Sequence, residues 1–230
     1  MNSEGITRGD KKSMQEARIA EIYHRVSNAY QIFSENGNEW EANGLNSTPF
    51  KNLVAAALST VTHSKRVIRA CVALFAVAST PEEIEKLDDD RLKELIRPVA
   101  HYNRKTIQLK EMCRQLIQRH GGEVPATREA LLALQGVGPK VADLIMNFNF
   151  GGDAIAVDTH IHRLLNRTGM VQTKSAEETA EIINRITPAQ YRKHAHEWLI
   201  QHGGLICAAK KPKCEECIIR DLCEYNRQKE

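Results

Sequence analysis

The chain has no apolar run long enough to span a membrane, and its polar first residues, MNSEGITRGDKK, are unlike a secretion signal. We therefore expect a soluble, intracellular and cytoplasmic protein with no membrane partner. Also absent is any sustained alternation of apolar and polar residues, the pattern of half-buried β-strands. Repeats of roughly 20–50 residues, which mark solenoid proteins, do not occur either. These absences leave an all-α fold as the prediction.

Charges of the two signs nearly balance, so composition alone assigns no partner. The 230 residues carry a net charge of +3 and a pI of about 8.5, which permits nucleic-acid binding without demonstrating it. With 42% hydrophobic residues, the chain can bury a substantial core in one domain or in two modest lobes. Its six cysteines, in a reducing compartment, point to metal binding or free thiols rather than disulfides.

Apolar residues at helical spacing run along most of the chain. We expect residues 1–12 to be a disordered polar tail, followed by a long amphipathic helix from Met14 and a loop over residues 36–47. Thr48 and Thr80 each precede a proline, which predicts two capped helix starts. Further helices are expected over residues 89–97, 104–120, 176–186 and 191–202. The buried face of the 104–120 helix should hold Ile107, Cys113, Leu116 and Ile117, and Cys71 should also be a core residue.

The stretch from Leu134 to Arg167 joins two helical patterns through the tetrapeptide GVGP at residues 136–139. Glycine tolerates the positive φ that a tight helix-to-helix turn needs, and Pro139 suits the first position of the next helix. The unpaired amides of a helix N-terminus can bind a phosphate that the glycines allow to approach. The sequence thus predicts contact with a DNA backbone through Gly136, Val137 and Gly138. An ordinary αα-hairpin would show the same three residues.

The carboxy-terminal segment carries four closely spaced cysteines: Cys207, Cys214, Cys217 and Cys223. Four thiolates within 17 residues can surround one metal centre, and zinc and iron–sulfur clusters both accept four thiolates. The residue types alone do not choose between them. Between the first two cysteines stand Lys210, Lys211 and Lys213, which would form a basic lip for DNA phosphates or simply a solvated charge run.

Taken together, GVGPK, VDTHIHRLLNRTG, HEWLIQHGGLIC and the cysteine spacing C-x6-C-x2-C-x5-C resemble the endonuclease III family of helix-hairpin-helix DNA glycosylases. The resemblance covers residues from about Tyr30 through Tyr225. It implies a [4Fe-4S] cluster on the four cysteines, and double-stranded DNA with a damaged base or abasic site as the partner. It also implies a DNA-repair enzyme that works at the nucleoid, and we expect it to act as a monomer.

The resemblance places the chemistry at Lys140 and Asp158. By its position within the motif, Lys140 matches the family's nucleophile, although an exposed helix lysine is the ordinary alternative. A helix N-terminus lowers the pKa of a lysine in its first turn, and a neutral amine can form a Schiff base. A nearby aspartate would oppose that shift. Asp158 matches the family's catalytic aspartate, although plain N-capping would also explain an aspartate before a helix. The implied activity is a bifunctional DNA glycosylase and abasic-site β-lyase that removes oxidised pyrimidines, flipping the damaged nucleotide out of the duplex.

Three positions depart from the family pattern. The family usually has glutamine at Val61, aspartate at Ser64 and a bulky apolar wedge at His101. The glutamine and the wedge fill the gap left by the flipped nucleotide and contact the opposite strand. Val61 has no side-chain hydrogen-bonding group, so contacts to the opposite base should differ. His101 can still stack in the gap, or it is an ordinary exposed loop residue.

The architecture implied is two helical lobes with the active site in a cleft between them. Residues 42–152 would form a six-helix lobe containing the hairpin. Residues 13–41 and 153–230 would form a cluster lobe, with the [4Fe-4S] loop at residues 207–223. The competing hypotheses are a variant glycosylase with shifted lesion or mismatch specificity, a DNA-binding relative with weak or lost base excision, and a zinc module on an unrelated helical protein.

Overall fold

The computed structural model describes residues 8–228 and confirms the all-α prediction, with no β-strand in that range. The disordered tail predicted for residues 1–12 lies outside the described residues as far as residue 7, but helix α1 already begins at Arg8. In the part of the chain that is described, no helix is long and apolar enough to cross a membrane.

The chain divides into two compact units, one of residues 34–152 and one made from both chain ends, residues up to 33 and from 153 onward. The expected boundary at residue 42 differs from this division. Trp40 packs against the core of the 34–152 unit, where its Nε1 donates a hydrogen bond to Ser64 Oγ at 2.9 Å. Leu45 is fully buried in the same core. These two apolar side chains place the Asn- and Gly-rich segment in this unit.

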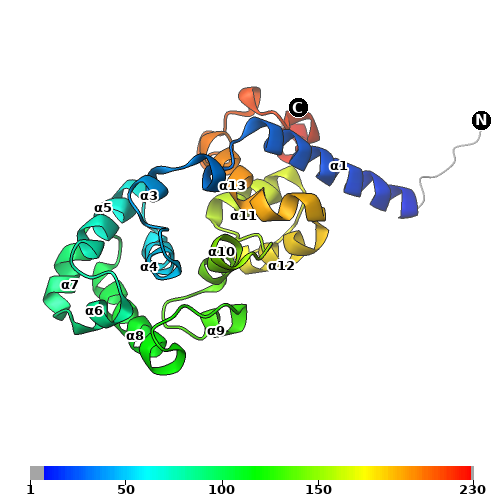
Figure 1. Ribbon diagram of the computed structural model, residues 1–230. Helices are drawn as coiled ribbons and strands as arrows, with labels where there is room; N and C mark the ends of the chain where they lie inside the picture. Colours follow the sequence, from blue (N-terminus) through cyan, green and yellow to red (C-terminus); the bar gives the residue numbers. More distant parts are fainter. Residues whose placement is uncertain (1–7, 229–230) are drawn as a thin grey trace, which may run out of the picture. The chain divides into compact units, whose positions relative to one another are not determined.

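The 34–152 unit is built around a helix that is buried on most of its surface. Its elements are α2 Phe33–Asn36, α3 Glu39–Ala42, α4 Pro49–Ser59, α5 Ser64–Phe75, α6 Pro81–Lys86, α7 Asp89–Ile96, α8 Tyr102–His120, α9 Arg128–Leu132 and α10 Pro139–Phe150. Four consecutive residues of α4, from Leu53 to Ala56, are buried, as expected of a helix with apolar residues on all sides. Helices α5 and α10 pack against α4 (Figure 1).

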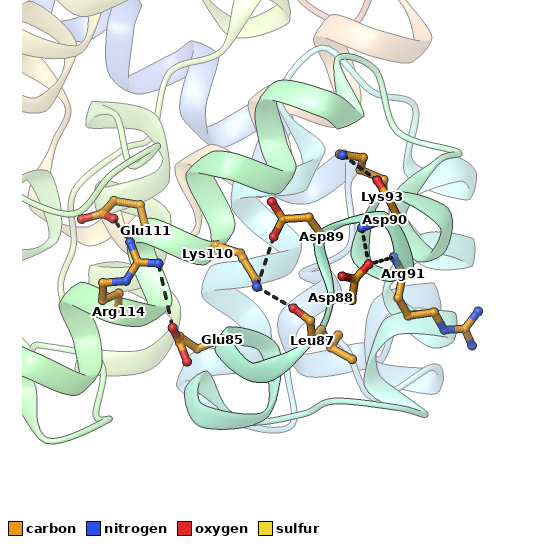
Figure 2. Close-up of polar contacts among 10 residues, drawn as sticks. All are labelled: Glu85, Leu87, Asp88, Asp89, Asp90, Arg91, Lys93, Lys110, Glu111 and Arg114. Atoms are coloured by element: carbon orange, nitrogen blue, oxygen red, sulfur yellow. Dashed lines mark hydrogen bonds and ion pairs between the residues drawn. The ribbon is translucent and has the colours of Figure 1, made fainter.

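Polar side chains fasten α8 to the α6–α7 corner (Figure 2). Lys110 of α8 donates to Leu87 O and pairs with Asp89 at 3.2 Å. Arg114, one turn further along, pairs with Glu111 and reaches Glu85 at 3.9 Å. The groups are mostly exposed, so each ion pair contributes at most about 1 kcal/mol. Together these contacts hold the long helix α8 against α6 and α7, and α8 in turn positions the loop of His101 that precedes it.

The other unit comprises α1 Arg8–Ala29, α11 Thr159–Thr168, α12 Ala176–Ile186, α13 Ala189–Leu205, the 3₁₀ turns η1 Cys214–Glu216 and η2 Arg220–Leu222, and α14 Glu224–Arg227. Helix α13 packs against both α1 and α11. Tyr23 of α1 is fully buried, and its hydroxyl lies 2.9 Å from Thr187 Oγ1. Tyr23 also stacks on Tyr191 of α13, so the amino-terminal helix and the carboxy-terminal half share one core.

The predicted helix starts are confirmed, but two of the four apolar residues expected on the buried face of α8 are not buried. Ile117 is half-buried, and Ile107 differs more. Thr48 caps α4, and Thr80 forms a capping box with Glu83 at the start of α6. Ile107, expected on the buried face of α8, is 68% exposed. The buried stripe of α8 instead runs through Lys105, Leu109, Met112, Cys113 and Leu116. Ile107 lies two residues from Lys105 and Leu109, which turns its side chain to the opposite face of the helix.

Candidate functional site

The hairpin between α9 and α10 has the geometry that its glycines predicted. Gly136 has a φ of 83°, and Gly138 is the N-cap residue of α10 with no side chain capping the helix. Pro139 occupies the first turn. Gly136 is exposed, whereas the side chain of Val137 is only 7% exposed and belongs to the core. The amide of Val137 donates to Leu134 O at 3.1 Å, so Val137 anchors the hairpin with both its side chain and its backbone, and the two glycines are the better candidates for a phosphate contact.

Two polar contacts brace this hairpin from outside. Arg128 Nε of α9 donates to Asp143 Oδ1 of α10 at 2.6 Å, and the Asp143 side chain is buried. The hydrogen bond to Asp143 raises the pKa of Arg128. The backbone amide of Gln135 donates to Gln115 Oε1 of α8 at 2.8 Å. The hairpin is thus held on both flanks, and Lys140 follows it, half-buried in the first turn of α10.

Asp158 stands at the start of α11 and caps it. Its Oδ1 accepts hydrogen bonds from the amides of His160 and Ile161, both at 2.9 Å. No hydrogen bond to Asp158 Oδ2 occurs within the described residues. A half-buried carboxylate with one oxygen engaged can still act on a neighbouring cation through the other. The N-capping interpretation is confirmed, and it is compatible with a catalytic role.

The segment before Asp158 is extended and buried, and side chains from two other helices hold it. Asn184 of α12 pairs with both backbone groups of Ile155, accepting at 2.7 Å and donating at 3.2 Å. His196 Nδ1 of α13 lies 2.8 Å from Ala156 O. Neither residue stood out in the sequence. Because they bond to backbone, only the tertiary fold reveals their part in placing Asp158.

Val61 and His101 lie in two loops of the 34–152 unit and are both exposed. Val61 follows α4 and is 82% exposed, and His101 is the N-cap residue of α8. Ser64, the third departure from the family pattern, starts α5 and accepts the hydrogen bond from Trp40. Sequence reasoning missed two residues next to these positions: Thr62, which follows Val61 in its loop, and Lys105, which is buried in α8. A signal existed, because Lys105 precedes Leu109 and Met112 by four and seven residues and so shares their buried stripe.

The four cysteines predicted as ligands line one small pocket that opens to solvent. Among the described residues, none of the four forms a disulfide. In the described part of the chain, no three His, Cys, Asp or Glu side chains converge closely enough to hold one metal ion. The pocket that the four sulfurs share is the site that fits a four-cysteine cluster. By contrast, Cys71 and Cys113 are buried in the other unit, where burial raises the pKa of each thiol to about 12.

Two arginines of α11 shape the loop that begins at Cys207. Arg167 Nη1 donates to Ala208 O at 2.8 Å and lies 3.5 Å from Cys207 Sγ, and its guanidinium stacks on the Tyr225 ring. Arg163 Nε donates to Cys207 O at 2.9 Å. Donors of this kind orient a ligand and lower the charge density on its sulfur. The sequence did not single out either arginine.

The three lysines of the loop differ in their surroundings. Lys213 pairs with Glu216 at 3.6 Å, which partly neutralises its charge. Lys210 and Lys211 are exposed, and neither forms an ion pair among the described residues. The first two therefore remain candidates for phosphate contacts, and Lys213 is a weaker one.

Comparison with known proteins identifies the family. The family model of the HhH-GPD superfamily base excision DNA repair proteins matches residues 54–189, more than half of the chain. Endonuclease III of Haemophilus influenzae is 44% identical over 183 residues, covering 80% of this chain and 87% of the relative. The chain belongs to the endonuclease III family. Endonuclease III of Escherichia coli K12 is 42% identical, covering 79% of this chain and 86% of the relative.

The endonuclease III family match extends to the cysteine segment and to solved structures. The iron–sulfur binding domain of endonuclease III matches residues 207–223, which confirms the predicted [4Fe-4S] cofactor on the cysteine loop. A trapped endonuclease III–DNA covalent intermediate is 31% identical and covers 79% of this chain and 86% of that chain, with a TM-score of 0.76. A thermostable thymine-DNA glycosylase, 24% identical with a TM-score of 0.79, shares the fold.

Proposed function

We propose that this member of the endonuclease III family is a bifunctional DNA glycosylase and abasic-site lyase for oxidised pyrimidines, with Lys140 as the nucleophile. The observation that carries the proposal is the placement of Lys140. It stands in the first turn of α10, directly after a glycine hairpin whose helix start no side chain caps. The amides of a helix start beside an amine suit a site that holds a DNA phosphate next to a reacting sugar.

In the proposed reaction, the neutral amine of Lys140 attacks C1′ of the damaged nucleotide. The C1′–N bond to the base breaks, and the base leaves with the electron pair and is protonated. Loss of the ring oxygen from C1′ gives a Schiff base. Removal of a C2′ proton then drives β-elimination, which breaks the C3′–O bond and releases the 3′ strand. Asp158 stabilises positive charge at the sugar and assists the proton transfers through its free oxygen.

The remaining residues hold the substrate. Amides of Gly136 and Gly138 would bind the DNA backbone, whereas the amide of Val137 already donates to Leu134 O. Lys210 and Lys211 would add long-range attraction to phosphate. When bound, the [4Fe-4S] cluster cross-links the 207–223 loop through four thiolates. The proposed partner is double-stranded DNA with a damaged base or an abasic site, handled by a monomer in the cytoplasm, at the nucleoid. The cleft between two lobes stays a prediction.

A test is borohydride trapping on duplex DNA containing either thymine glycol or an abasic site, with wild type and Lys140→Gln side by side. The proposal expects a covalent adduct on both substrates with wild type and on neither with the variant. A covalent endonuclease III–DNA intermediate in the solved relative supports the choice of assay. An adduct that persists in Lys140→Gln would overturn the assignment of the nucleophile.

Asp158 has two roles that substitution can separate. Asparagine is also a good N-cap residue, so Asp158→Asn should keep the start of α11 intact while removing the negative charge. Its turnover is expected to fall by roughly 10²–10⁴-fold with unchanged thermal stability. Asp158→Ala should lose the same activity and about 1 kcal/mol of stability. Normal turnover in Asp158→Asn would limit Asp158 to capping.

The departures at Val61 and His101 favour one alternative, a glycosylase whose lesion or mismatch specificity has shifted. Val61 is 82% exposed, yet its side chain has no group that can hydrogen-bond to an opposite base. An adduct only at the abasic site in the trapping assay would select this alternative. If the protein binds DNA and gives no adduct on either substrate, it is a binding member of the family without base excision.

A further inference from the structure

Two non-glycine residues in the described part of the chain have positive φ angles: Val61 at 57° and His101 at 55°. Histidine is among the residues that visit this region most readily, but a β-branched valine there is a true outlier. Such conformations persist only where surrounding structure enforces them. Both residues occupy the positions that probe the DNA gap in the family pattern. Contacts from the surrounding structure must therefore stabilise the backbone conformation of these two turns.

The group that holds the first turn is Lys105, in the first turns of α8. Its side chain is 7% exposed, and its Nζ donates to Leu58 O at 2.6 Å and to Thr60 O at 2.7 Å. A third contact reaches Thr62 Oγ1 at 3.4 Å. An ammonium has three donors, and here each has an acceptor. The three acceptors lie at the end of α4 and on both sides of Val61.

The same threonine joins the second turn to the first. The backbone amide of Ala100, the residue before His101, donates to Thr62 Oγ1 at 3.0 Å. The amide of Lys105 itself donates to His101 O at 3.0 Å, the first backbone bond of α8. Lys105 thus contacts the turn of Val61 with its side chain and the turn of His101 with its backbone amide. Thr62 adds a direct hydrogen bond between the two turns.

The surroundings of Lys105 explain why the ammonium stays at this place. Leu58 belongs to the last turn of α4, whose unpaired carbonyls carry partial negative charge and attract a cation. The other residues around the adjoining pocket come from α4, α8 and the hairpin, and none is titratable: Ala57, Leu58, Thr60, Gln108, Leu109, Met112, Gln135 and Gly136. No carboxylate in the described residues lies within ion-pair distance of Lys105. Its ammonium is therefore stabilised by two backbone carbonyl oxygens and the Thr62 hydroxyl alone. Burial accordingly lowers the pKa of Lys105 to about 8.

We propose that Lys105 is a positioning residue for base excision, which locks the turn of Val61 and the turn of His101 into one rigid unit for insertion into duplex DNA. The proposal rests on the proposed function for its consequence, because a rigid pair of probes matters only if a nucleotide is flipped out. Lys105 touches neither sugar nor base in this role. It acts by keeping two exposed side chains at a fixed separation and direction.

The first experiment tests the lock itself and needs no activity. Hydrogen exchange of the Ala100 amide is measured in wild type, Lys105→Met and Lys110→Met. Lys110 is the matched control, because it is a partly buried lysine of the same helix that donates to a backbone carbonyl, Leu87 O, at the far corner (Figure 2). Lys105→Met is expected to speed exchange at Ala100 by about tenfold or more, and Lys110→Met to leave it unchanged. Equal protection in the three proteins would overturn the lock.

The second experiment tests whether the contacts of Lys105 matter for base excision from duplex DNA. Excision of thymine glycol from duplex DNA is compared with cleavage of an abasic site in single-stranded DNA, where no gap in a duplex needs filling. Lys105→Met should lower kcat/KM on the duplex by roughly 10–100-fold and change the single-strand reaction by less than about threefold. Lys105→Arg keeps the charge and donors and should recover most of the duplex activity. A parallel loss on both substrates, unrelieved by arginine, would mean a merely structural lysine.

Failure of the proposal and failure of the proposed function give different results. Wild-type protein that cuts neither substrate refutes the proposed function, and the exchange measurement then still decides whether Lys105 locks the two turns. Wild-type protein that excises thymine glycol, with a Lys105→Met variant equally active on the duplex, refutes only the positioning role.

Discussion

Two tight turns of the 34–152 unit both need a positive φ, and they meet that need in different ways. In the hairpin before α10 the residue is Gly136, which adopts the conformation without strain. In the turn after α4 it is Val61, which does not, and a buried lysine holds the backbone instead. The first turn follows the family pattern and the second departs from it. The contrast suggests that the hairpin is set by local sequence and the probing turn by tertiary contacts.

The largest expected effect in this comparison comes from substituting Gly136 in the hairpin. A Cβ at Gly136 would lie 3.2 Å from Gln108 Cβ, at a φ of 83° that alanine disfavours. Gly136→Ala should therefore lower the free energy of unfolding by about 1–3 kcal/mol and weaken DNA binding. Gly138→Ala is the matched control, since a Cβ there meets no atom within 4 Å and the φ is negative. Urea denaturation compares them, and equal losses would contradict the argument.

Next in size are substitutions that restore the family's probing residues. Val61→Gln supplies an amide for the opposite strand, and His101→Leu supplies an apolar wedge. Gain of one hydrogen bond or one buried side chain corresponds to about 1 kcal/mol, so kcat/KM should change about three- to tenfold. The change should depend on the lesion and on the opposite base. Steady-state kinetics on several lesions tests this, and unchanged rates on every lesion would sink it.

A smaller effect concerns stability at the strained residue. Val61→Gly removes a β-branched side chain from a left-handed conformation and should raise the free energy of unfolding by roughly 0.5–1 kcal/mol. Val61→Ala, which removes methyl groups but keeps an L side chain, should gain less. Chemical denaturation measures both. A glycine variant less stable than wild type would show that the valine is not strained.

The last expected effect is confined to alkaline pH, and it is a pH dependence of stability due to Lys105. Its pKa is about 8 in the folded protein because of burial, against an ordinary value of 10.5. Between these values the unfolded chain binds more protons than the folded one, so stability should rise as pH increases from about 8 to 10.5 and should not depend on this lysine below about 8 or above about 10.5. Lys105→Met should lack this rise. Parallel stability curves for the two proteins across that range would contradict it.

Much of the candidate site was predictable because its residues report on local backbone. Gly136, Pro139, Thr48 and Thr80 each stand where a turn or cap demands their residue type, and the structure confirms those turns and caps. The roles of Lys140 and Asp158 stay predictions. Ile107 was misplaced because an apolar residue near helical spacing was assigned to the core, whereas the buried position belonged to Lys105. Charged residues are so rarely buried that a periodicity argument passes over them.

The sequence by itself determined most of the helices, the hairpin and the cap at Asp158, because neighbouring residues suffice to set helix starts and turns. It missed the short helix α3, which lies inside the predicted loop of residues 36–47. Only the tertiary structure decided that Trp40 joins the 34–152 core, that Asn184 and His196 hold the segment before Asp158, and that Lys105 and Thr62 connect the turns of Val61 and His101. Trp40 depends on the hydroxyl of Ser64 and on apolar packing, and the other residues depend on backbone groups far along the chain. A backbone oxygen carries no residue identity, so no sequence pattern marks the residues that bond to it.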